Sequence, residues 1–269
     1  MAVQVVTDSS ASLSEDVIAE LGITVLDLHV VEKPAKDGSV ERSTAGLSSL
    51  ELAAVYGRLV ERSQGDGVLV MHLPKELSST WTSAQTAVGL FDDDEIRIID
   101  SPAIAMAMGA AVMTAAKLAQ QGADLDECHH AALGVLSRSA TWVYLHRIDD
   151  LRRSGRLSAT TAILSTALLA TKPIMQFVDG KLELVGKTRT QAKAFNKLVE
   201  LISQEAGGEP AFVAIQHSDA EDAADTLYDL LVEALAPGSS VMVQEMGEVL
   251  QIHVGSGAVG VSAVFTVGE

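Results

Sequence analysis

The chain has 269 residues, of which 48% are hydrophobic, so it is long enough to bury a substantial core, and two domains are expected. Its net charge of −17 argues against a nucleic-acid-binding protein, which needs a basic surface, and against attraction to anionic lipids. Stable membrane insertion and a signal peptide are not expected, because no apolar run approaches the roughly 20 residues that span a bilayer and no basic segment precedes the first strand pattern. The single cysteine, Cys128, excludes an internal disulfide and fits a cytoplasmic location.

Three short apolar runs in the first part of the chain each lead into small hydroxyl residues. They are residues 3–6 before Thr7-Asp8-Ser9-Ser10, residues 68–71 before Leu77-Ser78-Ser79-Thr80, and residues 96–99 before Asp100-Ser101. A helical pattern follows each turn, so βαβ units and a parallel sheet are expected, with the turns at the carboxyl edge where open α/β folds bind ligands. Hydroxyl groups and backbone N–H groups at helix starts suit an anionic oxygen, which predicts a small ligand with a negatively charged head group.

The other elements expected before residue 150 are mostly helical. Helices are predicted at 13–21, 46–62, 79–90, 106–121 and 125–137, and strands at 23–26 and 140–145. The second helix has a cap at Ser48 or Ser49 with Glu51 in its first turn, and the Ala- and Met-rich helix 106–121 is expected to be buried. These elements predict a first domain, residues 1–150, with a mainly parallel sheet flanked by helices.

The pattern changes near Arg152, where residues 152–156 are predicted to be a polar turn. Further along the chain, helices are expected at 159–170, 190–206 and 221–235, and strands at 174–178, 181–184, 211–216, 240–244, 249–254 and 260–267. Asp179-Gly180 between two of these strands is a strong hairpin signal. The sequence therefore predicts a second α/β domain, residues 151–269, with an antiparallel or mixed sheet.

Positive charge is concentrated in residues 147–197, which carry ten of the 19 Lys and Arg against four Asp and Glu. This segment has a net charge of +6, whereas the rest of the chain has −23. It is either a solvated basic face or a docking surface for an acidic partner or an anionic head group.

Residues 255–260, Gly-Ser-Gly-Ala-Val-Gly, match the letters of the dinucleotide-binding fingerprint. They lie between two predicted strands and no helix follows, so a tight glycine turn is expected instead. His253 precedes this turn at the expected end of a strand, and is either structural or a ligand contact. His72 and His146, also at expected strand ends, are interpreted as structural.

Two catalytic or metal-binding alternatives have weaker support in the sequence. A hydrolase built on Ser78, Ser101 and His253 lacks the Gly-x-Ser-x-Gly elbow. The consecutive residues Cys128-His129-His130 would point to different faces of a helix, so a metal site is not expected.

Seven motifs, in order along essentially the whole chain, resemble those of the DegV family. They are Val-Thr-Asp-Ser-Ser at 6–10, Leu-Ser-Ser-Thr-Trp-Thr-Ser-Ala at 77–84, Ile-Ile-Asp-Ser at 98–101, Leu-Arg-Arg-Ser-Gly-Arg-Leu at 151–157, Lys-Pro-Ile at 172–174, Gly-Lys-Thr-Arg-Thr at 186–190 and His-Val-Gly-Ser-Gly-Ala at 253–258. The resemblance implies a two-domain α/β fold that holds a long-chain fatty acid in a tunnel between its domains. It further implies a cytoplasmic, non-catalytic subunit of phospholipid metabolism, without a cofactor or metal, that presents the carboxylate to a separate fatty acid kinase. The basic segment 147–197 is the candidate contact with that kinase.

The resemblance also implies four ligand-binding residues. Ser78 looks like the serine that hydrogen-bonds the carboxylate, His253 like the histidine that orients it, Thr44 like a threonine of the same site, and Arg156 like an arginine near the head group or the kinase. Three of these segments depart from the family pattern. Ser79 replaces the glycine that follows the serine at position 78. Thr44 is followed by Ala-Gly-Leu-Ser instead of a second hydroxyl and a proline, and Ser154 replaces the first glycine of Gly-Gly-Arg.

A fatty acid fits the chemistry of these residues. A buried methylene contributes about 0.8 kcal/mol, so a tail of about fifteen carbons offers on the order of 12 kcal/mol, and the head group can be held by uncharged donors. Candidate tunnel walls are residues 103–116 and 159–170. Two other classes remain open, a serine-dependent acyl-ester hydrolase and a lipid-free regulatory or interaction protein.

Overall fold

In the computed structural model, residues 2–34, 38, 40–92, 94–157 and 170–266 are described. The chain divides into two compact units, Met1–Ser137 and Arg138–Glu269, each built around its own sheet. The predicted α/β class is confirmed, with a parallel sheet in the first unit and a mixed sheet in the second. The helix predicted at 159–170 falls almost wholly outside the described residues. Among the described helices, none has both the length and the apolar character needed to cross a bilayer.

The sheet of the first unit contains four parallel strands. In spatial order they are β2 (Thr24–Leu26), β1 (Gln4–Asp8), β5 (Val68–His72) and β6 (Ile96–Asp100). Every residue of β5 is buried, as expected for a central parallel strand covered on both faces. From β1 the chain first moves to β2 on one side, and β5 later pairs with β1 on the other side. The switch point of the strand order therefore lies between β1 and β5, where open α/β sheets bind ligands.

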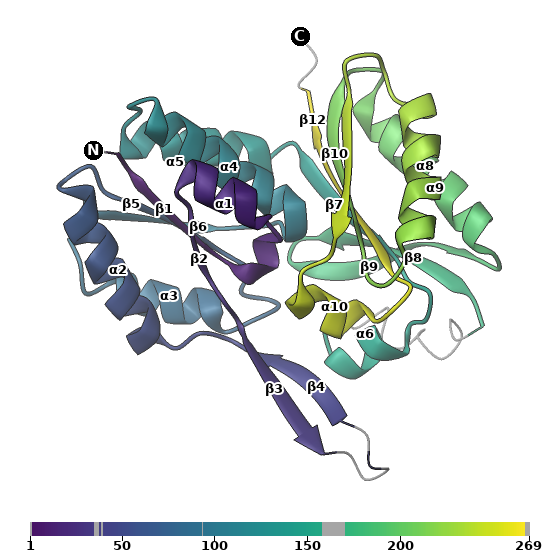
Figure 1. The fold of residues 1–269 in the computed structure, drawn as a ribbon, viewed down its shortest axis with the longest axis horizontal. Coiled ribbons are helices and arrows are strands. Elements are labelled where there is room, and N and C mark those ends of the chain that lie inside the picture. The colour runs from purple at the N-terminus through teal and green to yellow at the C-terminus, as the bar shows by residue number, and fades with distance from the viewer. Residues whose placement is uncertain (1, 35–37, 39, 93, 158–169, 267–269) are drawn as a thin grey trace. The chain divides into compact units, whose positions relative to one another are not determined.

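Helices cover both faces of this sheet (Figure 1). One face carries α2 (Ser49–Ser63) and α3 (Thr80–Val88), and the other carries α1 (Glu15–Leu21), α4 (Ala105–Gln120) and α5 (Leu125–Leu136). The predicted capping box of α2 is confirmed, because the Ser48 side chain accepts from the Glu51 amide and the Glu51 carboxylate accepts from the Ser48 amide. The expected burial of the Ala- and Met-rich helix is also confirmed in α4.

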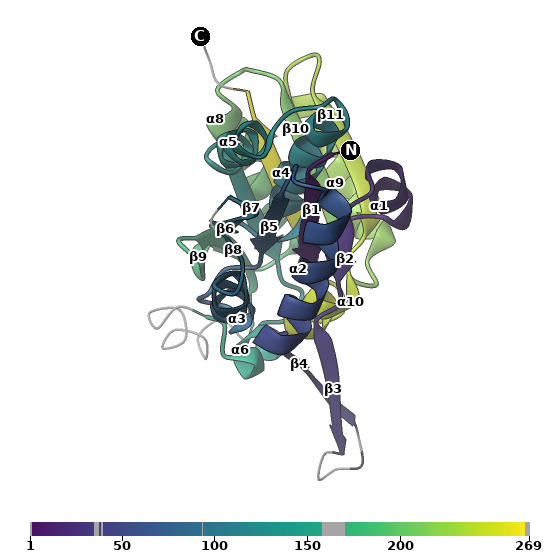
Figure 2. The same cartoon turned by 90° about the vertical axis from the view of Figure 1, so that its left-hand side faces the viewer.

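A hairpin of β3 (His29–Pro34) and β4 (Val40–Ala45) was not predicted from the sequence. Figures 1 and 2 show it extending away from the four-stranded sheet of its unit. Most of its side chains are exposed, and a cross-strand ion pair joins Arg42 Nε to Glu32 Oε1 at 3.3 Å. The hairpin has no buried apolar face, so the alternation that identifies a half-buried strand is missing from its sequence.

The sheet of the second unit has six strands in the order β11-β10-β12-β7-β8-β9. Their bounds are β7 (Ser139–Tyr144), β8 (Lys172–Val178), β9 (Lys181–Thr188), β10 (Ala211–His217), β11 (Ser240–Glu245) and β12 (Val259–Phe265). All pairs are antiparallel except β10 with β11. The predicted Asp179-Gly180 hairpin is confirmed, with φ of 47° and 76° at these two residues.

The strand expected at 140–145 lies in the second sheet and not in the first domain as predicted. It is β7, which pairs with β12 on one side and β8 on the other. Both partners are far along the chain, so local periodicity identifies the strand but not its sheet.

Two cores fill the second unit. On one face of the sheet, α8 (Gln191–Ala206) and α9 (Glu221–Ala234) pack against buried side chains that include Trp142 and Tyr144. On the other face, a smaller core with Leu145 and Met175 includes side chains of α6 (Asp149–Ser154) and of α10 (Glu248–Val254).

Two local predictions in this unit are wrong. Residues 152–156, expected to be a polar turn, contain the last residues of α6, and residues 249–254, expected to be a strand, belong to α10. The stretch 249–254 is rich in Val and Ile, which favour strands. Val254 packs on the smaller core together with Leu151 of α6, and this tertiary contact overrides the local preference.

Candidate functional site

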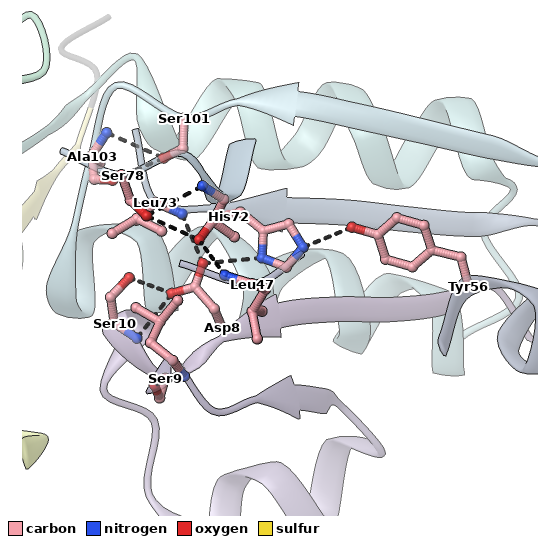
Figure 3. Close-up of polar contacts among 12 residues, drawn as sticks. Asp8, Ser9, Ser10, Leu47, Tyr56, His72, Leu73, Ser78, Ser101 and Ala103 are labelled. Atoms are coloured by element: carbon pink, nitrogen blue, oxygen red, sulfur yellow. Dashed lines mark hydrogen bonds and ion pairs between the residues drawn. The ribbon is translucent and has the colours of Figure 1, made fainter. Parts of the chain in front are cut away.

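The switch point of the first sheet is occupied by two buried ionisable residues, Asp8 at the end of β1 and His72 at the end of β5 (Figure 3). Asp8 Oδ2 accepts hydrogen bonds from His72 Nδ1 at 3.0 Å and from the Leu73 amide at 2.9 Å. Asp8 Oδ1 accepts from the amide and the hydroxyl of Ser10, at 3.0 and 2.5 Å. Four donors therefore satisfy a carboxylate that is fully removed from solvent.

The protonation of this network follows from its partners. Burial alone would raise the pKa of Asp8, but the hydrogen bonds and charge of His72, together with the donors of Ser10 and Leu73, hold the pKa below its usual value. Burial and the Asp8 carboxylate raise the pKa of Tyr56, whose hydroxyl lies 2.8 Å from His72 Nε2. Within the described part of the chain this is the hydroxyl's one hydrogen-bond partner. We therefore infer that the Tyr56 hydroxyl donates to Nε2 and that Nδ1 donates to Asp8.

Three hydroxyl residues, Ser78, Ser79 and Thr80, lie at the start of α3 and form what is called here the hydroxyl cluster. Ser78 Oγ lies 3.0 Å from Thr80 Oγ1 and accepts from the Thr80 amide at 3.2 Å. Thr80 is buried and accepts from the Leu47 amide at 3.2 Å, whereas Ser78 is half-buried and Ser79 is exposed. Ser78 and Ser79 are therefore accessible to a ligand, while Thr80 connects the cluster by a hydrogen bond to the segment before α2.

Gly46 brings that segment against the hydroxyl cluster. A Cβ atom at Gly46 would lie 2.8 Å from Thr80 Oγ1 and 2.9 Å from both Ser78 Oγ and Ser79 Oγ. The backbone can approach this closely because glycine has no side chain. Thr44 lies two residues earlier, half-buried in β4, so the segments of the predicted residues Thr44 and Ser78 meet at Gly46.

Two other hydroxyl residues at this sheet edge, Ser9 and Ser101, form hydrogen bonds with the backbone. Ser9 Oγ accepts from the Leu28 amide at 3.0 Å. Ser101 is buried, and its hydroxyl donates to the Ala103 carbonyl at 3.0 Å and accepts from the Ala103 amide at 3.1 Å. These bonds stabilise the turns after β1 and β6, which leaves the half-buried Ser78 as the better candidate for ligand contact.

The second unit holds the predicted residues Arg156 and His253. His253 lies in the last turn of α10 and not at the end of a strand, as the sequence had suggested. Burial and the nearby Arg156 cation lower the pKa of His253 to about 4, so its imidazole is neutral at physiological pH. Arg156 is half-buried just after α6, and its guanidinium donates to the Ser154 carbonyl. The structure therefore brings Arg156 and His253 into one electrostatic environment.

The glycine turn after His253 is confirmed. Helix α10 precedes it and strand β12 follows it, so it is not a dinucleotide-binding loop. Gly255 and Gly257 have φ of 77° and 82°, a conformation that other residues rarely adopt. A Cβ at Gly257 would lie 2.7 Å from the Cβ of His146, and one at Gly255 would overlap the Asp150 carboxylate. Glycine is required here for close packing within the second unit.

The sequence-based prediction of the site did not include Asp8, Tyr56 or His72. The position of Asp8 and His72 at the ends of two apolar strands was a usable signal, because such ends meet at the ligand-binding edge of a parallel sheet. Tyr56 had no such signal, since it lies within a helix at a position that reads as ordinary core. Over the described ranges, no group of three or more His, Cys, Asp or Glu side chains is arranged to hold a metal ion.

Comparison with known proteins adds the evolutionary context. Residues 2–266 match the family profile described as uncharacterised protein, DegV family. A DegV domain-containing protein from Corynebacterium glutamicum is 53% identical over 265 residues, which cover 98% of this chain and 94% of the relative. The crystal structure of a DegV family protein from C. glutamicum superposes with a TM-score of 0.94 at 51% identity, covering 100% of this chain and 98% of the other. The crystal structure of a fatty-acid-binding protein from Bacillus subtilis superposes with a TM-score of 0.84 at 26% identity, covering 99% of this chain and all of the other.

Proposed function

The chain belongs to the DegV family, and from this premise we propose that it binds a long-chain fatty acid whose carboxylate is held by the hydroxyl cluster. The observation that carries the proposal is the half-buried hydroxyl of Ser78 beside the switch point of a parallel sheet, in a fold shared with a fatty-acid-binding relative. Thr44, Arg156 and His253 are the further proposed contacts of the head group.

Uncharged donors suit this ligand. A hydroxyl group and a neutral imidazole can hydrogen-bond a carboxylate without forming a tight ion pair, so its oxygen keeps its nucleophilic character. The free energy of binding would come mainly from the tail, at about 0.8 kcal/mol for each buried methylene. The residues at the head group would then determine its orientation more than the affinity.

We further propose that the protein is a non-catalytic cytoplasmic carrier that presents the carboxylate to a fatty acid kinase, with no cofactor of its own. The basic segment 147–197 is the proposed contact with the kinase. Arg147 and Arg153 are paired with Asp149 and Asp150. In contrast, Lys187, Arg189 and Lys193 form no ion pair within the described residues, so their positive charge is available to an acidic partner.

A hydrolase is less well supported than a carrier. A general base needs a free imidazole nitrogen near the nucleophile. Both ring nitrogens of His72 are engaged, by Asp8 and by Tyr56, and the ring is fully buried. His72, at the carboxyl end of β5, is therefore suited to hold the local structure and not to activate Ser78.

The binding proposal can be tested with delipidated protein and a mixture of long-chain fatty acids, followed by mass spectrometry of the lipid released on denaturation. We expect retention of fatty acid by the unmodified protein. Ser78→Ala should weaken binding about 3- to 10-fold through loss of one hydrogen bond. Ser83→Ala, in the first turn of α3, is the matched control and should bind normally. Recovery of no lipid from the unmodified protein would refute the carrier.

The presentation step needs a second measurement, the yield of acyl-phosphate with the cognate kinase. Arg156→Ala should reduce this yield more than it reduces fatty acid uptake, because a half-buried cation near the head group contributes to docking more than to the burial of the tail. An equal loss of yield and uptake would contradict a role in docking.

A further inference from the structure

We propose that Asp8, His72 and Tyr56 are positioning residues for Ser78, an inference that rests on the proposed carboxylate site. They hold the segment between β5 and α3 in the one conformation in which the hydroxyl of Ser78 faces the head group. None of the three is proposed to touch the ligand, since each is fully buried.

The first step of the argument is the anchor at Leu73. The Asp8 carboxylate accepts from the Leu73 amide at 2.9 Å and from His72 Nδ1 at 3.0 Å, so it holds the last residue of β5 and the residue that follows it. Pro74 O then accepts from the amides of Leu77 and Ser78, at 3.0 and 3.3 Å. Only one hydrogen-bonded turn separates the Leu73 amide from Ser78. A displacement of Leu73 would therefore also displace the Ser78 hydroxyl.

The second step is the connection through α2. Thr80 Oγ1, which contacts Ser78 Oγ, accepts from the amide of Leu47 just before α2 begins. Two turns into the same helix, Tyr56 bonds His72 Nε2 at 2.8 Å. The hydrogen bonds therefore close a ring that runs from Ser78 through α2 to His72 and Asp8 and back through Leu73 (Figure 3).

The third step is energetic. Burying a carboxylate, an imidazole and a phenol costs free energy, because these groups lose their hydration. Apolar side chains of similar volume would stabilise a core at least as well. A fully hydrogen-bonded network gives instead a unique geometry, because each partner accepts only one arrangement of the others. The network lies at the switch point of the sheet, where such geometry serves a ligand.

The test compares two ligands of the same chain length, a long-chain fatty acid and its methyl ester. Tyr56→Phe keeps the ring but removes the donor to His72, so affinity for the acid should fall about 3- to 10-fold, while affinity for the ester changes less than about 2-fold. In a protein that already carries Ser78→Ala, Tyr56→Phe should cause no further loss of affinity for the fatty acid. Tyr144→Phe is the matched control, because the buried Tyr144 hydroxyl has no partner among the described residues.

His72→Asn provides a second variant if Tyr56→Phe does not fold, because the shorter amide can still donate to Asp8 but cannot reach Tyr56. It should show the same selective loss of acid binding. Equal weakening of acid and ester by a folded variant, or additive effects with Ser78→Ala, would overturn the positioning role while leaving the carrier intact. Failure of the unmodified protein to bind either ligand would overturn the proposed function and this inference with it.

Discussion

Gly46 shows how one missing side chain can keep a site open. Three hydroxyl oxygens stand within 2.9 Å of the position that its Cβ would take. Its φ is not in the left-handed region, so alanine is compatible with the backbone there. The only conflict is steric, between the new Cβ and the three hydroxyl oxygens. Substitutions at this position therefore test the hydroxyl cluster without straining the backbone.

We predict that Gly46→Ala displaces the hydroxyl cluster and weakens fatty acid binding at least about 10-fold, while the cost in folding free energy stays within about 1–3 kcal/mol. Isothermal titration and chemical denaturation measure the two effects. Gly134→Ala is the control, since a Cβ there meets no atom within 4 Å in α5, and it should stabilise the protein by about 0.4–1 kcal/mol. Normal fatty acid binding by Gly46→Ala would remove the cluster from the site.

His253 has a pKa of about 4 in the folded protein, below the ordinary histidine value of 6.5. Between these two values the unfolded chain binds a proton that the folded chain does not, so the free energy of unfolding falls as the pH is lowered from about 6.5 to 4. The expected loss is at most about 3.5 kcal/mol, since each unit of pKa shift corresponds to about 1.4 kcal/mol.

His253→Gln should remove this part of the pH dependence, as measured by denaturation between pH 4 and 7. His146 is a useful comparison, because burial and the nearby Lys172 and Arg147 also lower its pKa. If the free energy of unfolding of the His253→Gln protein depends on pH as steeply as that of the unmodified protein, the imidazole is not kept neutral by burial beside Arg156.

At the scale of the element, helices with strong local signals were predicted well. The start of α2 is set by the reciprocal bonds of Ser48 and Glu51, which lie three residues apart and can be recognised in the sequence. In contrast, the strand propensity of residues 249–254 gave the wrong element, because α10 is a short helix held by packing against α6 and its neighbours.

We predict that Ser48→Ala lowers the free energy of unfolding by about 1 kcal/mol at neutral pH, through loss of the cap of α2. Ser49→Ala, at the next position, is the control and should have little effect. The hydrogen bonds from Ser48 lower the pKa of Glu51, so the contribution of this carboxylate is lost as the pH falls below about 4. The difference between the Ser48→Ala and unmodified proteins should therefore shrink on acidification, and a constant difference would argue against the capping box.

At the scale of the whole molecule, the chain combines two units, each with its own sheet and core. A ligand that binds only the folded state stabilises that state by mass action, by about 2.7 kcal/mol when its free concentration is 100 times the Kd. The proposed fatty acid should therefore leave a measurable signature in unfolding experiments.

We predict that adding long-chain fatty acid to delipidated protein raises the temperature of the unfolding transition that includes the first unit, in a concentration-dependent way. Ser78→Ala should reduce the shift at equal fatty acid concentration, whereas Ser83→Ala should not. Differential scanning calorimetry measures both. The absence of any shift at saturating fatty acid would contradict binding to the native state.

The sequence by itself determined the α/β class, most helix starts and the hydroxyl residues at the sheet edge. These depend on periodicity, capping and turn chemistry, which act over a few neighbouring residues. The motifs from residue 6 to residue 258 also indicated the family, because their order and spacing extend over the whole chain.

Only the tertiary structure decided that β7 belongs to the second sheet, that residues 248–254 form a helix, and that Tyr56, His72 and Asp8 form one network. Tyr56 and Asp8 lie far apart in the sequence on a helix and a strand, and nothing local to either residue specifies the other. The packing of α2 on the sheet brings them together. Because a buried carboxylate and a buried imidazole both need hydrogen-bond partners, only the folded chain shows which residues supply them.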